Sequence, residues 1–91
     1  MAKRFVVYGR VQGVGFRYFT WKEAEKIGIK GTVRNCTDGS VEIIAEGNDD
    51  QLQLFYDWLK VGPRTATVEQ VLVDNIEDKQ YSDFSIIHRE N

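Results

Sequence analysis

The chain has 91 residues, of which 42% are hydrophobic and 29% are charged, which suits one folded domain and leaves no room for a second. No apolar run approaches the ~20 residues of a membrane-spanning helix, and the apolar stretch near the start is too short for a signal peptide, so we expect a cytoplasmic protein. The single cysteine, Cys36, can form no intrachain disulfide, and with the single histidine, His88, it makes no metal-binding cluster, so we expect no metal and no cofactor.

The chain begins with a predicted strand and a predicted helix. Residues 4–9 (RFVVYG) are β-branched or aromatic and apolar on both sides, which is typical of a central strand. From Phe16 to Ile27, apolar residues recur at helical spacing while charged residues lie between them, and Gly28 follows as a stop. We therefore expect a helix that begins at Phe16 and ends at Gly28.

The next segment predicts a β-hairpin. Residues 30–36 and 41–47 read as strands, and apolar side chains in the second of them alternate onto one face. The pair Asp38-Gly39 between them suits a tight turn that needs a positive φ angle. Asn35 then lies at the end of a strand, close to the turn.

The second half of the chain predicts a helix and two strands. Asn48 is a good N-cap with Gln51 three residues later, and the helix that follows ends at Gly62-Pro63. Residues 67–76 predict a strand, although their apolar residues break strict alternation, so we expect a bulge or irregularity there. Residues 83–87 predict a last, short strand at an edge.

The order of these elements defines a fold class. Strand, helix, strand, strand, helix, strand, with one extra terminal strand, is the split βαβ pattern. We therefore expect an α+β protein with the ferredoxin-like βαββαβ architecture. This is a two-layer sandwich in which two helices cover one face of an antiparallel sheet, formed by residues 1–91 as a single domain.

The loop at residues 10–16 is the first candidate for a binding site. Glycines at 13 and 15 permit backbone angles that turn successive N–H groups inward, and the following helix adds the positive end of its dipole, a combination that suits phosphate. Arg17 follows with a permanently charged guanidinium. Residues 1–34 hold eight Lys or Arg and two Glu, which also favours an anionic ligand. Glycine spacing alone would favour a simple tight turn with Arg17 as a surface residue.

Known nucleotide-binding glycine motifs are absent from this loop. The sequence contains no G-x-x-x-x-G-K-[ST], and a G-x-G-x-x-G pattern fails because Tyr18 stands at the third glycine position. Nucleotide binding is therefore disfavoured.

Five segments together resemble the acylphosphatase family from end to end. Members of this family are small ferredoxin-like enzymes that hydrolyse the carboxyl-phosphate bond of acyl phosphates without a metal. The resemblance implies an acylphosphatase whose partner is a small acyl phosphate rather than a nucleic acid or a membrane, and we expect a monomer. The five segments are VYGRVQGVGFR (7–17), GTVRN (31–35), DGSVEI (38–43), GPRTATV (62–68) and FSI (84–86).

The resemblance also implies roles for individual residues. Arg17 and Asn35 match the catalytic residues: Arg17 binds the phosphate, and Asn35 orients the attacking water. Asn35 is not titratable, so the resemblance implies that the proton of the water passes to the substrate phosphate. The phosphate-binding residues are Gln12, Gly13, Val14, Gly15, Phe16 and Arg17.

The chemistry of acyl phosphates fits such a site. Their leaving group is a carboxylate with a pKa near ~4, which departs at neutral pH without being protonated. A phosphate monoester leaves as an alkoxide and needs an acid or a metal, and we find no convincing candidate for either. Asp38 precedes a glycine in a turn, so we interpret it as structural rather than as a base. His88 is expected at the surface.

Two other functions have the same fold. One is an RNA-binding module, but there the aromatic residues lie on a strand, whereas the aromatics of VGFRYF (14–19) begin a predicted helix. The other is a non-catalytic phosphate-binding module or the related domain of a hydrogenase-maturation protein. Because we expect a single domain and the sequence has both Arg17 and Asn35, we favour an active enzyme. The roles of Cys36 and of residues 89–91 stay undecided, so no contact of the terminal carboxylate with Arg17 is assumed.

Overall fold

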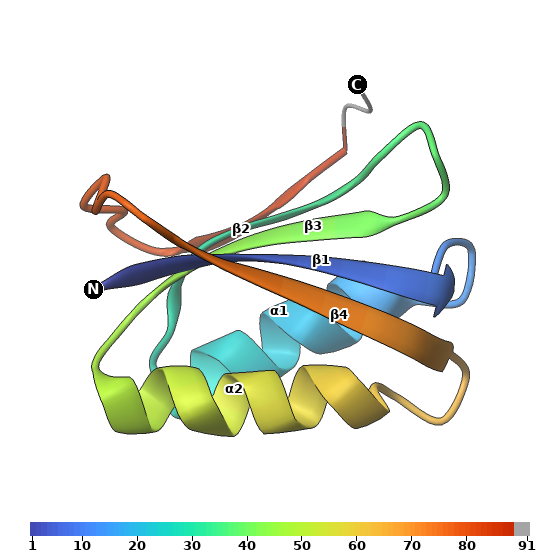
Figure 1. The fold of residues 1–91 in the computed structure, drawn as a ribbon, viewed down its shortest axis with the longest axis horizontal. Helices are drawn as coiled ribbons and strands as arrows, with labels where there is room; N and C mark the ends of the chain where they lie inside the picture. Colours follow the sequence, from blue (N-terminus) through green and yellow to red (C-terminus); the bar gives the residue numbers. More distant parts are fainter. Residues whose placement is uncertain (89–91) are drawn as a thin grey trace.

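The protein is a two-layer sandwich of one sheet and two helices (Figure 1). The computed structural model describes residues 1–88. Both helices lie on the same face of the sheet, so the ferredoxin-like architecture is confirmed, and the predicted helix bounds agree with the observed ones. The elements are β1 (Ala2–Arg10), α1 (Phe16–Ile27), β2 (Lys30–Asn35), β3 (Val41–Glu46), α2 (Asp49–Val61), β4 (Thr67–Ile76) and β5 (Phe84–Ile87).

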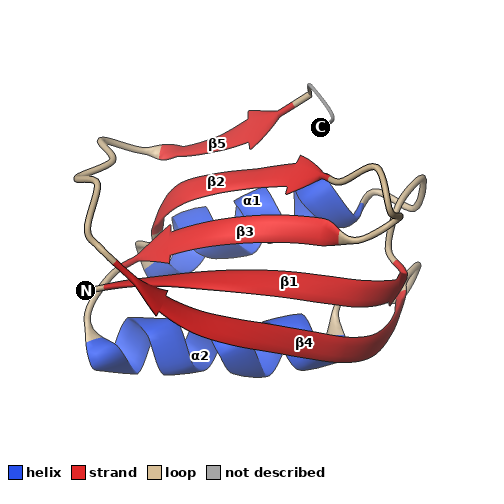
Figure 2. Cartoon of the chain, turned by 45° about the horizontal axis from the view of Figure 1, so that its top comes forward, coloured by secondary structure: helices blue, strands red, loops and turns tan. Residues whose placement is uncertain are grey.

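The sheet has the strand order β4-β1-β3-β2-β5 (Figure 2). β1 pairs antiparallel with both β3 and β4, so its predicted central position is confirmed. β5 lies at an edge, as predicted, but it pairs parallel with β2. The predicted antiparallel sheet is thus formed by β1 to β4, and the extra terminal strand joins its edge in the parallel direction. The chain leaves β4 at one edge and crosses to the other edge before β5 begins, which brings β5 in alongside β2 in the same direction.

The predicted irregularity in residues 67–76 is confirmed. Tyr8 pairs with Gln70 and Gly9 pairs with Val68, so Glu69 is an extra residue on β4. One additional residue in a strand reverses the face onto which later side chains point. This shift lets Val68 and Val71, which strict alternation would separate, both pack against the hydrophobic core.

The core lies between the sheet and the two helices. β1 and β3 contribute alternate residues such as Phe5 and Ile43, which are fully buried, and α2 contributes Phe55. The rings of Phe5 and Phe55 meet edge to face, with centroids 6.1 Å apart. The sheet is thereby held on the helices with its other face open.

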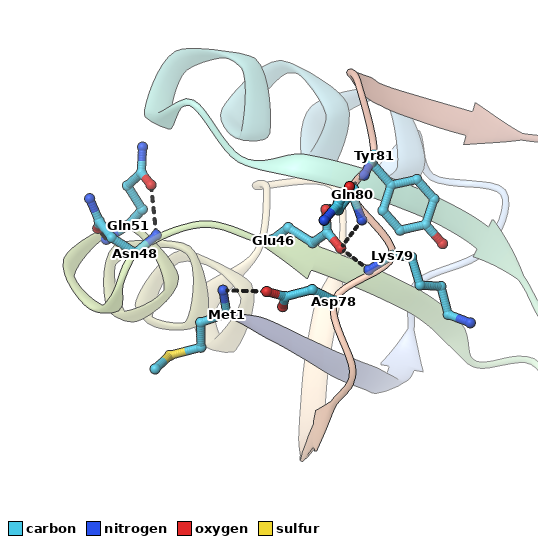
Figure 3. A network of polar contacts seen from close by, with 8 residues as sticks. All are labelled: Met1, Glu46, Asn48, Gln51, Asp78, Lys79, Gln80 and Tyr81. Carbon is cyan, nitrogen blue, oxygen red and sulfur yellow. Dashed lines mark hydrogen bonds and ion pairs between the residues drawn. The ribbon is translucent and has the colours of Figure 1, made fainter.

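The connection from β4 to β5 forms hydrogen bonds with a carboxylate at the end of β3 (Figure 3). Glu46 accepts hydrogen bonds from the backbone N–H groups of Lys79, Gln80 and Tyr81 at 2.5, 2.9 and 2.8 Å. The N-terminal ammonium forms an ion pair with Asp78 at 3.1 Å in the same region. These contacts hold the connection across the ends of β1 and β3, which places β5 beside β2.

Candidate active site

The loop between β1 and α1 has the backbone that its glycines predict. Gly13 has a φ angle of 74° and Gly15 a φ angle of 80°. Residues with a Cβ atom are strained in this left-handed region, so both positions favour glycine. Gly15 is also the N-cap of α1, and its carbonyl accepts the N–H of Phe19 at 3.1 Å. The loop therefore runs directly into the first turn of the helix.

The N-termini of the two helices differ in a way that matters for binding. Asn48 and Gln51 form a complete capping box at the start of α2, and two aspartates lie in its first turn. The start of α1 has no side-chain cap and no acidic residue in its first turn. The first N–H groups of a helix have no partner within the helix and carry a partial positive charge. At α1 these groups are left open to an anion.

A pocket of about 190 Å³ lies at this end of the molecule. The β1–α1 loop, the end of β2 and the end of β5 all reach this end of the sheet (Figure 2). None of the described residues that line the pocket is acidic. Arg17 and Asn35, which are distant in sequence, both line it. The remaining lining residues are Val11, Gly13, Gly15, Phe16, Tyr18, Ile86 and His88.

Arg17 supplies a cation that pairs with no carboxylate of the described residues. Its half-buried side chain donates a hydrogen bond from Nη1 to the carbonyl oxygen of Ile87 at 3.0 Å. Among residues 1–88 it has no carboxylate partner, whereas Arg4 and Arg34 both form ion pairs with Glu42. The backbone carbonyl of β5 orients the guanidinium without neutralising it. The question whether the terminal carboxylate contacts Arg17 concerns residues 89–91, which lie outside the described residues.

Asn35 brings a carboxamide with an unpaired oxygen to the same pocket. The residue is only 8% exposed, and its Oδ1 atom is buried without a hydrogen-bond partner among the described residues. An unpaired buried polar group costs about 1–3 kcal/mol, so such groups need an explanation such as a bound water or a catalytic role. The pocket that Asn35 lines offers space for such a bound water.

Gln12 and Val14 lie in the loop but do not line the pocket. The Nε2 atom of Gln12 donates to the carbonyl oxygens of Cys36 and Ser40 at 2.7 and 2.8 Å. These two residues flank the turn that follows Asn35. The Gln12 side chain therefore ties the glycine loop to the strand end that carries Asn35, and it points at the turn instead of the pocket.

Asp38 has the structural role that its turn position predicts. Its Oδ1 atom accepts hydrogen bonds from the hydroxyl and the backbone N–H of Ser40 at 2.6 and 2.9 Å. These hydrogen bonds from Ser40 lower the pKa of the Asp38 carboxyl below its ordinary value. A lowered pKa makes a carboxylate a weaker base, so Asp38 is poorly suited to accept a proton.

Sequence reasoning missed the contribution of β5 to the site. Ile86 and His88 line the pocket, and Ile87 holds Arg17. His88 is exposed, as expected, but it lies at the pocket and not on an unrelated surface. No local signal points to these residues, because their position depends on the parallel pairing of β5 with β2. Tyr18 in α1 was likewise unassigned, although it directly follows Arg17.

A family model described as Acylphosphatase matches residues 3–86. The acylphosphatase of Pasteurella multocida (strain Pm70) is 56% identical over 87 residues, which cover 94% of this chain and 97% of that protein. The chain belongs to the acylphosphatase family. Acylphosphatases are hydrolases that act on small-molecule acyl phosphates, so the expectation of an enzyme of this class is confirmed.

Solved acylphosphatase structures share the fold closely. The crystal structure of acylphosphatase from Bacillus subtilis matches with a TM-score of 0.91 and 42% identity, covering 94% of this chain and 97% of that one. An acylphosphatase from Coxiella burnetii matches with a TM-score of 0.91 and 37% identity, covering 94% and 90%. Within residues 1–88, neither helix is long and apolar enough to span a membrane.

Proposed function

We propose that this acylphosphatase hydrolyses acyl phosphates by metal-independent attack of water on phosphorus, with the phosphate in the pocket at the start of α1. The observation that carries the proposal is that Arg17 and Asn35 line one pocket next to an uncapped helix N-terminus. A cation, open backbone N–H groups and a carboxamide whose oxygen has no partner among the described residues lie together there.

The phosphate group of the substrate binds between the glycine loop and Arg17. Open backbone N–H groups at residues 13–16 and the positive end of α1 attract its oxygens. The Arg17 guanidinium donates further hydrogen bonds through a planar fork that matches the geometry of phosphate oxygens. Phosphoryl transfer needs mainly positioning and charge stabilisation, so these groups also stabilise the transition state.

Asn35 orients the attacking water in this mechanism. Asn35 is buried at the end of β2, and the Gln12 hydrogen bonds to Cys36 and Ser40 hold the turn that follows it. The water oxygen forms a bond to phosphorus, and the bond from phosphorus to the acyl oxygen breaks. The carboxylate leaves with the electron pair of that bond. The water proton passes to a phosphate oxygen, so the products are a carboxylate and inorganic phosphate.

This mechanism needs no general acid. A carboxylate leaving group with a pKa near ~4 is stable as an anion at neutral pH. An alkoxide leaving group is far more basic and must be protonated or bound by a metal as it departs. We therefore expect the enzyme to accept acyl phosphates and to reject phosphate monoesters.

The experiment compares two aromatic substrates in the presence of a chelator. Benzoyl phosphate and phenyl phosphate present the same phosphate group on different leaving groups, so they form a matched pair. We expect hydrolysis of benzoyl phosphate at an unchanged rate in excess chelator, with negligible hydrolysis of phenyl phosphate. Loss of activity in chelator, or comparable rates on both substrates, would overturn the mechanism.

We further propose that residues 1–91 act as one monomeric domain in the cytoplasm, without a nucleic acid partner. The aromatics Phe16, Tyr18 and Phe19 belong to α1 and not to the sheet, which does not suit an RNA-binding sheet surface. Cys36 is a free thiol, which suits a reducing compartment. Sedimentation velocity tests the monomer, and a gel-shift assay with single-stranded RNA tests the absence of nucleic acid binding.

A further inference from the structure

The glycine loop has a contact with a segment that is fifty residues away in the sequence. Thr65 lies in the loop at residues 62–66 that joins α2 to β4, and its Oγ1 atom donates a hydrogen bond to the carbonyl oxygen of Val14 at 2.6 Å. Gly62 of the same loop lies against Phe16, since a Cβ atom there would be 3.4 Å from the ring. The α2–β4 loop thus supports the glycine loop at two points.

The Thr65 contact sets the orientation of one peptide group. The peptide that joins Val14 to Gly15 is planar and trans, so its carbonyl and its N–H point in opposite directions. Thr65 holds the carbonyl toward the α2–β4 loop. The Gly15 N–H therefore points the other way, and Gly15 lines the pocket whereas Val14 does not.

A peptide that precedes a glycine can turn over at low energetic cost. A flip of the peptide changes ψ of Val14 and φ of Gly15 together, and glycine accepts positive and negative φ angles almost equally. The same glycine that lets the loop form therefore makes the flip inexpensive. A flipped peptide would direct a carbonyl oxygen into the pocket, where it would repel a phosphate oxygen.

We propose that Thr65 is a positioning residue that holds the Gly15 N–H toward the phosphate. The inference rests on the proposed function of the pocket as the phosphate site. Thr65 does not touch the substrate. It acts through the Val14 carbonyl, to which its hydroxyl donates the hydrogen bond.

The test uses Thr65→Val, which replaces the hydroxyl by a methyl group of similar size. Thr65 is exposed, so the variant is expected to fold, and its thermal unfolding midpoint checks this. A net hydrogen bond corresponds to a change of roughly 3-fold to 10-fold in an equilibrium. We expect kcat/KM for benzoyl phosphate to fall, and the inhibition constant of inorganic phosphate to rise, by about that factor.

Two further variants make the test specific to the hydroxyl. Thr65→Ser keeps the donor and should restore kcat/KM to within about twofold of the wild type. Thr67→Val makes the same substitution at an exposed threonine of β4 outside the pocket, and it should leave both constants unchanged. Activity of Thr65→Val within twofold of the wild type would overturn the proposal, and so would failure of Ser to restore it.

A second readout separates this inference from the proposed function. In an NMR titration with inorganic phosphate, the Gly15 amide resonance of the wild type should shift, and the shift should shrink in Thr65→Val. If the wild type binds phosphate at Gly15 but does not hydrolyse benzoyl phosphate, the catalytic proposal fails and the role of Thr65 is still decided by this comparison. If phosphate leaves the Gly15 resonance of the wild type unmoved, the inference about Thr65 is overturned.

Discussion

The guanidinium of Arg17 is held by the backbone carbonyl of Ile87, with 3.0 Å between Nη1 and the oxygen. Arg17 lies in the first turn of α1, and Ile87 is the last residue of β5. A carbonyl acceptor fixes the direction of the side chain and leaves its positive charge available. The edge strand β5 therefore orients the positively charged side chain of Arg17.

Replacing Arg17 by lysine is the first prediction. Lysine keeps a positive charge but loses the planar fork that can hold both Ile87 and a phosphate. Removing one preorganised donor from a charged transition state lowers kcat by roughly 10²–10³. We expect Arg17→Lys to lose at least that much activity on benzoyl phosphate. Arg10→Lys, at an exposed arginine outside the pocket, serves as the control and should keep wild-type kcat.

Asn35 should show opposite effects on activity and on stability. Asn35→Leu removes the buried oxygen that has no partner, so the free energy of unfolding should stay constant or rise by up to about 2 kcal/mol. The same change removes the group that we propose orients the attacking water, so kcat should fall by a larger factor than the affinity for inorganic phosphate. Urea denaturation and steady-state kinetics measure the two effects. A variant that loses stability and keeps its kcat would contradict the role of Asn35.

Glu46 should control the placement of β5. Glu46→Gln replaces one oxygen of the carboxylate by an NH₂ group, which cannot accept the N–H groups of the β4–β5 connection. We expect the free energy of unfolding to fall by about 1–2 kcal/mol and hydrogen exchange in β5 to become faster. We also expect a smaller kcat, because Ile87 at the end of β5 holds the Arg17 side chain. Glu77 lies on the same connection and is exposed, so the control variant Glu77→Gln should have the stability and kcat of the wild type.

Glu42 should contribute a stability that acid removes. Partial burial raises the pKa of its carboxyl, but hydrogen bonds from Arg4 and Arg34 at 2.5 and 2.8 Å outweigh this and hold the pKa below its ordinary value of 4.5. The folded state therefore binds this proton less readily than the unfolded state. The stabilisation is fully present above about pH 4.5 and is lost as the pH falls through the lowered pKa.

Glu42→Gln provides the measurement for this prediction. The variant should be less stable than the wild type at pH 7, by about 1–3 kcal/mol, because a charged acceptor between two guanidinium groups is lost. Between about pH 5 and about pH 3, the range in which ordinary carboxyl groups titrate, the free energy of unfolding of the variant should fall less than that of the wild type. Glu25→Gln, at an exposed residue of α1, should leave the pH profile unchanged.

Local patterns determined much of this protein. The end of α1 at Gly28, the capping box of Asn48 and Gln51, and the positive φ angles at Gly13 and Gly15 all depend on residues within a few positions of one another. The family motif added candidate roles for Arg17 and Asn35, and those roles stay predictions until the variants are measured. Such features are accessible from sequence because steric limits and hydrogen bonds within one turn act before the chain is packed.

The tertiary structure alone decided how these pieces meet. The parallel pairing of β5 with β2, the hold of Ile87 on Arg17, and the contact of Thr65 with Val14 join residues that lie 50 or more positions apart. The Gln12 side chain likewise binds the turn after Asn35 and does not line the pocket that holds Arg17 and Asn35. Each of these contacts is weak by itself and forms only because the whole core fixes the partners in place. No local pattern records such a dependence, so the geometry of the site had to come from the fold.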